Sequence, residues 1–289
     1  MQDKKIIVIL VIYNGAQWIS KNITSLLKSQ LAVDVLAIDN KSTDNSVELI
    51  KKFPQVTLLE QDQNLGFGKA NNLGMQWAVD HKYTHVFLLN QDTWIFPNTI
   101  KLLASFSEAH PEFGVVSPTH LSDAKGTLDA GFKTYLSRAT TLDEVHAVVP
   151  FVNAAAWFMP VEVIEKVGYF EALFGHYGED RNYMDRLAFH HYKAAVFHDA
   201  LIVHDRVIKR NLSKDMTQSK YLILCQLLNP NNSLLSGFVQ GGKSVFGLPK
   251  YFSKDYDQYE IKELFQDLAH FYLLQLKRVK LLKQARKNY

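Results

Sequence analysis

The sequence predicts an α/β fold, in which a wound sheet is flanked by helices and followed by a helical C-terminal extension. Short β-branched runs alternate with amphipathic stretches up to about residue 120, which is typical of parallel strands connected by helices. Three of these runs end in polar residues, and an apolar helical period begins near Tyr256. Of the 289 residues, 47% are hydrophobic and 21% are charged, so the chain can bury a core of ordinary size.

The first half contains five strand candidates. They are IIVILVIY (6–13), VDVLAID (33–39), VTLLEQ (56–61), HVFLLN (85–90) and FGVVSP (113–118). Apolar residues at helical spacing follow the first strand and predict a helix before the second. The first candidate comes after two lysines but ends in a turn without a cleavage site, so we interpret it as a buried strand and not as a signal peptide.

The pattern changes after about residue 120. Residues 121–150 are polar without a clear period, and FVNAAAWFMP (151–160) predicts a strand before a short helix that ends at Gly168. From about Tyr256 a helical pattern runs to the end, with an apolar stripe of Phe265, Leu268, Tyr272, Leu276, Val279 and Leu282. We therefore expect a first domain over residues 1–206 and a largely helical extension over residues 207–289.

The formal net charge of +3 is unevenly distributed. After Asp267 the chain has no acidic residue and six basic ones: Lys277, Arg278, Lys280, Lys283, Arg286 and Lys287. The rest carries 26 basic and 29 acidic residues, a net charge of −3. The last helix therefore has two interpretations, packing on the body with a solvated basic side or lying on an anionic membrane surface.

Composition restricts the compartment and the metal chemistry. Cys225 is the only cysteine, which excludes an intrachain disulfide and a thiolate-built zinc site and fits a reducing compartment. No apolar stretch approaches the ~20 residues that a bilayer-spanning helix needs. We expect a cytoplasmic protein, free or peripheral on the inner face of the membrane.

Polar side chains follow three of the predicted strands directly. They are Tyr13 and Asn14, Asp39 and Asn40, and Asn90, Gln91 and Asp92. Ligands of open parallel sheets bind beyond the carboxyl ends of the strands. We expect these three ends to line one crevice.

Two residues at the strand ends are carboxylates that can bind a nucleotide and its metal ion. Asp39 can accept hydrogen bonds from the ring NH of a pyrimidine or from a ribose hydroxyl, although it also fits a turn. Asp92 can supply an oxygen to Mg²⁺ or Mn²⁺, which fill the rest of their shell with phosphate oxygens and water. The alternative for Asp92 is a residue that only ends its strand.

A glycine-rich segment, NLGFGKANNLG (64–74), leads from the third strand into a helix. Glycines allow close approach of the backbone and a helix N-terminus attracts phosphate, so this segment can face a nucleotide. Its candidate contacts are Asn64, Gly66, Lys69 and Asn71. It is neither a Walker loop nor the dinucleotide fingerprint, because no Gly-Lys-Ser/Thr follows and the segment comes after the third strand.

A second acidic cluster lies in HYGEDRNYMDR (176–186). Glu179 and Asp180 follow an aromatic, glycine-containing loop and begin a predicted helix, where acids also suit the helix dipole. A catalytic base must take a proton from an alcohol in a cleft, and Asp180 is our candidate. His204, at the end of the apolar segment AVFHDALIVH (195–204), is a candidate metal ligand.

The order of these segments resembles a known family. IYN, IDNKSTDNS, NLGFGKANNLG, LLNQDT, VNAAAWFMP, GYFEALFGHYGED and a late histidine are similar to the family 2 glycosyltransferases of the GT-A fold. NLGFGKANNLG with LLNQDT resembles the rhamnosyltransferase branch in particular. The resemblance covers about residues 5–206 and implies a nucleotide-binding half up to about residue 120 and an acceptor half after it.

The resemblance also implies roles for individual residues. It places Asp39 at the donor base, and we expect the donor side to include Tyr13, Asn14, Asn64, Gly66, Lys69, Asn71, Asn90 and Gln91 as well. Asp92 and His204 hold the metal, Asp180 is the catalytic base, and acceptor binding or support falls to Asn153, Trp157, Glu179 and Arg186. The chain departs from the family at the DxD motif, which reads Asn90, Gln91, Asp92, at the FDE segment, which reads Phe170, Glu171, Ala172, and at Asn182, which replaces an acid.

The implied reaction moves rhamnose or another hexose from a dTDP- or UDP-sugar to a hydroxyl of a glycan or lipid-linked saccharide. It inverts the anomeric carbon, uses Mg²⁺ or Mn²⁺, serves cell-surface polysaccharide synthesis and involves no nucleic acid. Two alternatives stay open. A catalytically inactive nucleotide-sugar-binding scaffold is conceivable because one DxD carboxylate is missing, and a nucleotidyltransferase would need a basic glycine-rich loop in place of Tyr13–Ala16.

Overall fold

The structure is a computed structural model that describes residues 4–206 and 211–289. The chain forms two compact units. The first comprises Met1–Phe170 and His190–Arg206, and the second comprises Glu171–Phe189 and Val207–Tyr289. The segment that carries the second acidic cluster therefore packs with the C-terminal helices, whereas the domain limits expected from the sequence stay a prediction.

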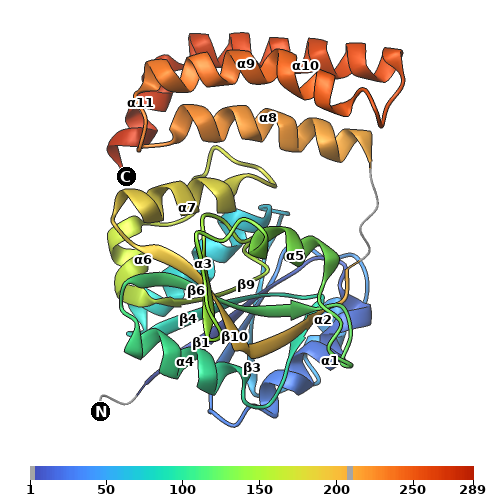
Figure 1. Ribbon diagram of the computed structural model, residues 1–289. Coiled ribbons are helices and arrows are strands. Elements are labelled where there is room, and N and C mark those ends of the chain that lie inside the picture. The colour runs from blue at the N-terminus through green and yellow to red at the C-terminus, as the bar shows by residue number, and fades with distance from the viewer. Residues whose placement is uncertain (1–3, 207–210) are drawn as a thin grey trace. The chain divides into compact units, whose positions relative to one another are not determined.

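The first unit is built on one ten-stranded mixed sheet (Figure 1). Its strands are β1 (Ile6–Ile12), β2 (Asp34–Asp39), β3 (Val56–Glu60), β4 (His85–Asn90), β5 (Thr93–Ile95), β6 (Phe113–Leu121), β7 (Thr141–Leu142), β8 (His146–Val149), β9 (Ala156–Pro160) and β10 (Lys193–His204). The strand order is β3-β2-β1-β4-β9-β6-β10-β8-β7, and β5 pairs with β10. The wound sheet expected from the sequence is confirmed, and each of the five strand candidates forms a strand of it.

The centre of the sheet is parallel because apolar strands buried on both faces alternate with helices. β1 pairs in parallel with β2 and with β4, and the side chains of Val8, Ile9 and Leu10 are fully buried. β9 runs antiparallel to β4, which makes the sheet mixed. The short strands β7 and β8 and a helix lie within residues 121–150, where the sequence showed no period.

In the described part of the first unit, six helices flank the sheet. They are α1 (Ala16–Leu27), α2 (Ser46–Ile50), α3 (Phe67–Asp80), α4 (Thr99–Ala109), α5 (Ala130–Leu136) and α6 (Val161–Val167). α1, α2 and α4 pack on the face that carries Val8 and Leu10. α3 packs on the other face, where a Cβ at Gly74 would lie 2.5 Å from Ile9 Cγ2, so glycine permits this close approach.

The second unit is helical in the part that the structure describes. Its helices are α7 (Glu179–Phe189), α8 (Leu212–Leu228), α9 (Leu234–Phe252), α10 (Gln258–Lys277) and α11 (Val279–Lys287). Side chains of Asn211, Ser233 and Asp257 cap α8, α9 and α10, and Asp257 forms a capping box with Glu260. None of the described helices is both long enough and apolar enough to span a membrane.

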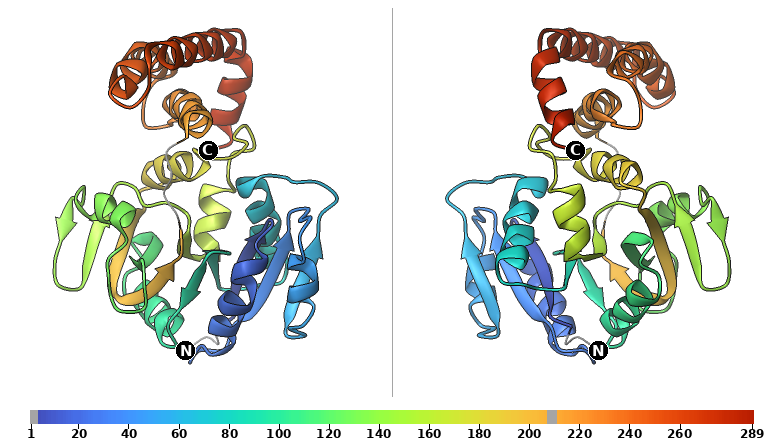
Figure 2. Two further views of the ribbon diagram at one scale, coloured as in Figure 1. Left: turned by 90° about the vertical axis from the view of Figure 1, so that its right-hand side faces the viewer. Right: turned by 90° about the vertical axis from the view of Figure 1, so that its left-hand side faces the viewer.

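The single helix expected from Tyr256 to the end is wrong, because the chain turns at Arg278. α10 ends at Lys277, and α11 then lies across the end of the helical bundle (Figure 2). Leu282 and Ala285 of α11 belong to the core of the second unit. The apolar side of the terminal helix is therefore a packing surface, and its lysines form the solvated side.

Replacing Leu282 with alanine should destabilise the protein. Leu282 is fully buried, and removing a buried leucine side chain costs about 2 to 5 kcal/mol. The neighbouring Leu281 is 45% exposed, so Leu281→Ala should change the free energy of unfolding by less than about 0.5 kcal/mol. Urea unfolding of the full chain measures both, and equal effects would contradict the buried position of Leu282.

Candidate active site

The parallel register brings the polar strand ends of β1, β2 and β4 side by side. Ile12 pairs with Asp39, and Val11 pairs with Asn90, so Tyr13, Asp39 and Asn90 share one edge of the sheet. This is the carboxyl edge, where ligands of such sheets bind. The sequence-based expectation that the three ends line one region agrees with this geometry.

Gln91 ties the end of β4 to the end of β1. Its side-chain oxygen accepts a hydrogen bond from Tyr13 N at 2.9 Å, and its Nε2 donates to Tyr13 O at 3.1 Å. A Cβ at Gly15 would lie 2.2 Å from the Gln91 oxygen, so only glycine leaves room for this pair of hydrogen bonds. Gln91 therefore shapes the edge through the backbone of Tyr13, whose own side chain is 45% exposed.

The loop after β2 is held by short hydrogen bonds. Asn14 has φ 48°, in the left-handed region that asparagine tolerates, and its side-chain oxygen accepts from Thr43 N at 2.8 Å. Asp39 is buried and accepts from Ser42 N at 3.1 Å. Asp39 thus stabilises the turn, which was the alternative interpretation from the sequence, and it also lies at the edge of the sheet.

Asn40 joins this loop to the glycine-rich segment. Its Nδ2 donates to the side-chain oxygen of Asn64 at 2.9 Å, and its own oxygen accepts from Leu65 N at 2.8 Å. Gly66 has φ 79°, where a side chain would be strained, and leads directly into α3. The N-terminus of α3 is thereby fixed beside the end of β2.

Two further candidates on α3 differ in accessibility. Lys69 is exposed on the first turn, so its ammonium can reach a phosphate. Asn71 is 2% exposed and donates to Phe67 O at 3.0 Å within the helix. The structure therefore gives Asn71 an intrahelical role, and Lys69 is the accessible residue of the pair.

Asp92 and His204 are brought together by antiparallel pairing between β5 and β10. His204 pairs with Thr93, and Asp205 N donates to Asp92 O at 2.8 Å. The Nε2 atom of His204 lies 3.4 Å from Oδ1 of Asp92. That Oδ1 atom is buried without a hydrogen-bond partner, which is unfavourable for a carboxylate oxygen unless a ligand satisfies it.

Residues that the sequence did not single out hold the end of β10. Arg206 forms two hydrogen bonds with Asp129, from Nη2 at 2.5 Å and from Nε at 3.2 Å. Asp129 also caps α5 by accepting from Phe132 N at 2.6 Å. The Arg206–Asp129 pair joins the end of β10 to α5, and no local sequence pattern predicts it because the two residues are far apart in the chain.

His120 supports the ring of His204. It is fully buried, stacks on Phe132 with centroids 4.2 Å apart, and meets the edge of His204 at 5.5 Å. Burial and the nearby His204 and Arg206 lower the pKa of His120 well below its usual range. His120 is therefore a neutral packing partner at physiological pH.

The two candidates before and within β9 have different surroundings. Trp157 is fully buried in the sheet, so it can support the fold but presents no surface to an acceptor. Asn153 precedes the strand and is partly exposed, with a buried side-chain oxygen that has no hydrogen-bond partner. Of these two residues, Asn153 is the one whose polar group is available to a ligand.

Glu179 and Asp180 open α7 in the second unit. Glu179 is 4% exposed. Its burial and, to a smaller extent, the charge of the neighbouring Asp180 raise the pKa of Glu179 to about 7. Asp180 Oδ1 accepts from Arg181 N at 2.8 Å. Burial also raises the pKa of Asp185 on the same helix to about 6. Acids of raised pKa are a common property of sites that move protons.

Arg186 is buried between two aromatic rings. Its guanidinium lies 5.0 Å from the Tyr183 ring and 4.9 Å from the Tyr289 ring, and its Nε donates to Asn182 at 3.1 Å. Tyr289 Oη donates to Glu171 at 3.1 Å. Since Arg186 is 2% exposed, it supports α7 from inside the unit.

Protein side chains alone do not build a closed metal site in the described ranges. Across residues 4–206 and 211–289 no three His, Cys, Asp or Glu side chains gather as metal ligands. Asp92 and His204 give one carboxylate and one imidazole. This set resembles an open site that a ligand completes.

Comparisons with solved structures show the class of fold. The chain is similar to residues 1–349 of S. aureus TarS in complex with UDP-GlcNAc, with a TM-score of 0.66 and 17% identity over 92% of this chain and 80% of that chain. It is also similar to the mannosyltransferase PcManGT from Pyrobaculum calidifontis in complex with GDP-Man and Mn²⁺, with a TM-score of 0.62 and 15% identity over 97% and 85%. The chain spans 44% of the longer TarS structure. These likenesses identify the fold as GT-A.

Residues 7–168, more than half of the chain, match the model of glycosyl transferase family 2, and the chain belongs to that family. The comparison with curated protein sequences gives no match. The fold and the family are those that the order of its motifs indicated.

Glu179 should make stability depend on pH between about 4.5 and 7. Its folded pKa of about 7 exceeds the ordinary 4.5, so the unfolded chain ionises first and stability falls as the pH rises through this window. Glu179→Gln removes this fall, which is on the order of 3 kcal/mol. Urea unfolding of both proteins at about pH 5 and about pH 8 measures the difference. A difference that is the same at both pH values would show that Glu179 does not hold a proton in the folded state.

Proposed function

We propose that the chain transfers rhamnose or another hexose from a dTDP- or UDP-sugar to a hydroxyl of a glycan or lipid-linked saccharide, with inversion. The process it serves is cell-surface polysaccharide synthesis at the cytoplasmic side of the membrane. The proposal rests on one observation above all: Asp92 and His204 meet at the end of the sheet, with a buried carboxylate oxygen that lacks a partner.

The donor side of the proposal uses the carboxyl edge of the sheet. The TarS structure holds UDP-GlcNAc and the PcManGT structure holds GDP-Man, both nucleoside diphosphate sugars. In this chain Asp39 takes the base or ribose, and the N-terminus of α3 with Lys69 takes phosphate oxygens. Asn90 and Gln91 set the position of Asp92, which follows them directly.

The residues present fit Mg²⁺ or Mn²⁺. Asp92 Oδ1 and His204 Nε2 would hold the ion, and diphosphate oxygens and water would complete its shell. The PcManGT structure contains Mn²⁺ together with its donor. A bound divalent cation would neutralise charge on the departing diphosphate. One carboxylate in place of the usual two favours an ion that binds together with the donor.

Asp180 is the base in this proposal. Asp180 takes the proton of the acceptor hydroxyl while the hydroxyl oxygen attacks the anomeric carbon of the donor sugar from the face opposite the diphosphate. The C–O bond to the acceptor forms as the bond to the diphosphate breaks, and a single displacement inverts the configuration. Glu179, whose pKa of about 7 keeps it partly protonated, adds less than a full negative charge beside Asp180 at neutral pH.

The rhamnosyltransferase assignment rests on the similarity of NLGFGKANNLG and LLNQDT to that branch. Thermal-shift screening of dTDP-rhamnose against UDP-glucose and UDP-GlcNAc, each with Mn²⁺, tests the donor. Stabilisation by dTDP-rhamnose alone would support the branch, and stabilisation by the UDP-sugars alone would replace it. Release of free nucleoside diphosphate from the bound donor distinguishes an enzyme from a binding scaffold.

Asp180→Asn should lower turnover by ~100-fold or more, since general-base catalysis is typically worth 10² to 10⁴. Donor binding should be unchanged, because the substitution keeps the size of the side chain. Glu263→Gln makes the same change from carboxylate to amide at an exposed position of α10 and is the control, which should keep its activity. Retention of more than about a tenth of the activity by Asp180→Asn would remove this residue from the role of base.

Asp92→Ala should weaken nucleoside diphosphate binding chiefly in the presence of Mn²⁺, because its carboxylate acts through the cation. Calorimetry with UDP and with dTDP, each with Mn²⁺ and with EDTA, measures the four affinities. Asp199→Ala, at an exposed position of β10, is the control. Equal losses with and without Mn²⁺ would make Asp92 a structural residue.

A further inference from the structure

The second unit presents an apolar surface on the outside of two helices. Six large apolar side chains are exposed there: Leu235, Val239 and Phe246 of α9, and Phe265, Leu273 and Leu276 of α10. We call these six residues the α9–α10 face. Their exposed fractions run from 37% for Phe265 to 75% for Leu235, although side chains of this type are usually buried.

The six side chains form one surface because α9 and α10 pack as a hairpin. The rings of Phe246 and Phe265 lie 5.5 Å apart across the two helices. Towards the other end of the hairpin, Tyr272 Oη donates to Phe238 O at 3.0 Å. Figure 1 shows the two helices side by side along their length. Positions 235, 239 and 246 recur at the helical repeat and share one side of α9.

The face is distinct from the core of the unit. Gly237, Gly241 and Val245 lie on the opposite side of α9 and are buried. α9 is therefore apolar on its inner side and largely apolar on its outer side. A helix with two apolar sides needs a second apolar environment besides its own core.

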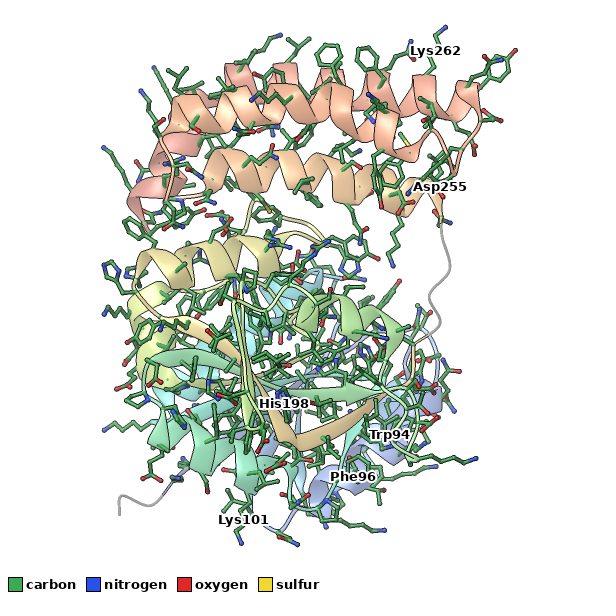
Figure 3. All side chains as sticks on the ribbon, viewed as in Figure 1. Trp94, Phe96, Lys101, His198, Asp255 and Lys262 are labelled. Carbon is green, nitrogen blue, oxygen red and sulfur yellow. The ribbon has the colours of Figure 1, made fainter. Side chains whose placement is uncertain are left out.

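The charges beside the face are positive. α9 contains Lys243 and Lys250 and no acidic residue, and both lysines are exposed. On α10 the exposed Lys262 and Lys277 stand near the apolar side chains, and Figure 3 shows Lys262 projecting away from its helix. Most acids of the hairpin are engaged elsewhere. Asp257 and Glu260 form the capping box at the start of α10, and Asp267 pairs with Lys220 of α8 at 3.0 Å.

We propose that the α9–α10 face docks on a membrane surface that contains anionic lipid. Apolar side chains enter the boundary between headgroups and acyl chains, and lysines beside them meet the negative headgroups. A second copy of the chain fits this surface less well, because a contact between two copies would bring the lysines of both α9 helices to the interface, and α9 has no acid to pair with them. The terminal helix α11 is not part of the docking surface, since Leu282 and Ala285 are buried in the core.

Vesicle co-sedimentation of the full-length protein tests the docking surface. Phosphatidylglycerol and phosphatidylcholine vesicles should bind the protein at low salt, binding should weaken as salt is raised, and vesicles of phosphatidylcholine alone should bind it weakly. Lys243→Glu with Lys250→Glu should lower the partition coefficient by about 20-fold or more. Phe246→Asp should lower it by about tenfold or more.

Two controls at exposed positions lie outside the α9–α10 face. Leu142→Asp changes a 64% exposed leucine of β7, and Lys101→Glu changes an exposed lysine of α4 that Figure 3 labels. Both should bind vesicles as the unchanged protein does, and thermal unfolding should show that all variants are folded. A Phe246→Trp variant adds a direct reading, because its emission should shift to the blue when vesicles of phosphatidylglycerol are added.

Three results would overturn the proposal. The first is absence of binding to phosphatidylglycerol vesicles at low salt, and the second is equal loss of binding in the face and control variants. The third is a concentration-dependent dimer that Phe246→Asp dissociates, which would assign the surface to a second copy. None of these results depends on the donor, the acceptor or Asp180, so docking and transferase activity are tested separately.

Discussion

The candidate site depends on the register of β1 against its two parallel neighbours. Because Val11 pairs with Asn90 and Ile12 with Asp39, three strands end at the same level, and the residues that follow them face the same edge. A shift of one residue would turn the side chains of a whole strand to the opposite face and move its polar end along the edge. β1 is buried on both faces along nearly its whole length, and this packing fixes the register, so the core determines where the polar strand ends lie.

A second constraint brings Asp92 and His204 together, although 112 positions separate them in the sequence. β5 is only three residues long, but it pairs antiparallel with the end of β10 and so sets Thr93 opposite His204. Arg206 with Asp129 and His120 with Phe132 then hold the strand end and the imidazole ring. In the proposed metal site these contacts would fix the orientation of the imidazole, as residues around a metal ligand commonly do.

The sequence predicted the elements whose signals are local. Continuous apolar runs marked the five parallel strands, and Gly168 marked the end of α6, as the structure confirms. The break at Arg278 was missed because the apolar period continues across it and no glycine or proline interrupts the helix. The pairs Arg206–Asp129 and Arg186–Tyr289 were missed because each joins residues about 80 to 100 positions apart. Asn153 and Trp157 had the same candidate role in the sequence, which could not show that Trp157 is buried whereas Asn153 is partly exposed.

The pair of hydrogen bonds between the Gln91 side chain and the Tyr13 backbone has an evolutionary consequence. Because the Gln91 amide both donates to and accepts from the backbone of residue 13, a carboxylate at position 91 could not replace it without losing the donor. The same amide occupies the space in which a side chain at position 15 would have to lie. Substitutions at positions 15 and 91 are therefore coupled: a relative that carries alanine or serine at position 15 should carry a shorter residue at position 91. Covariation of these two positions would record the contact across the family.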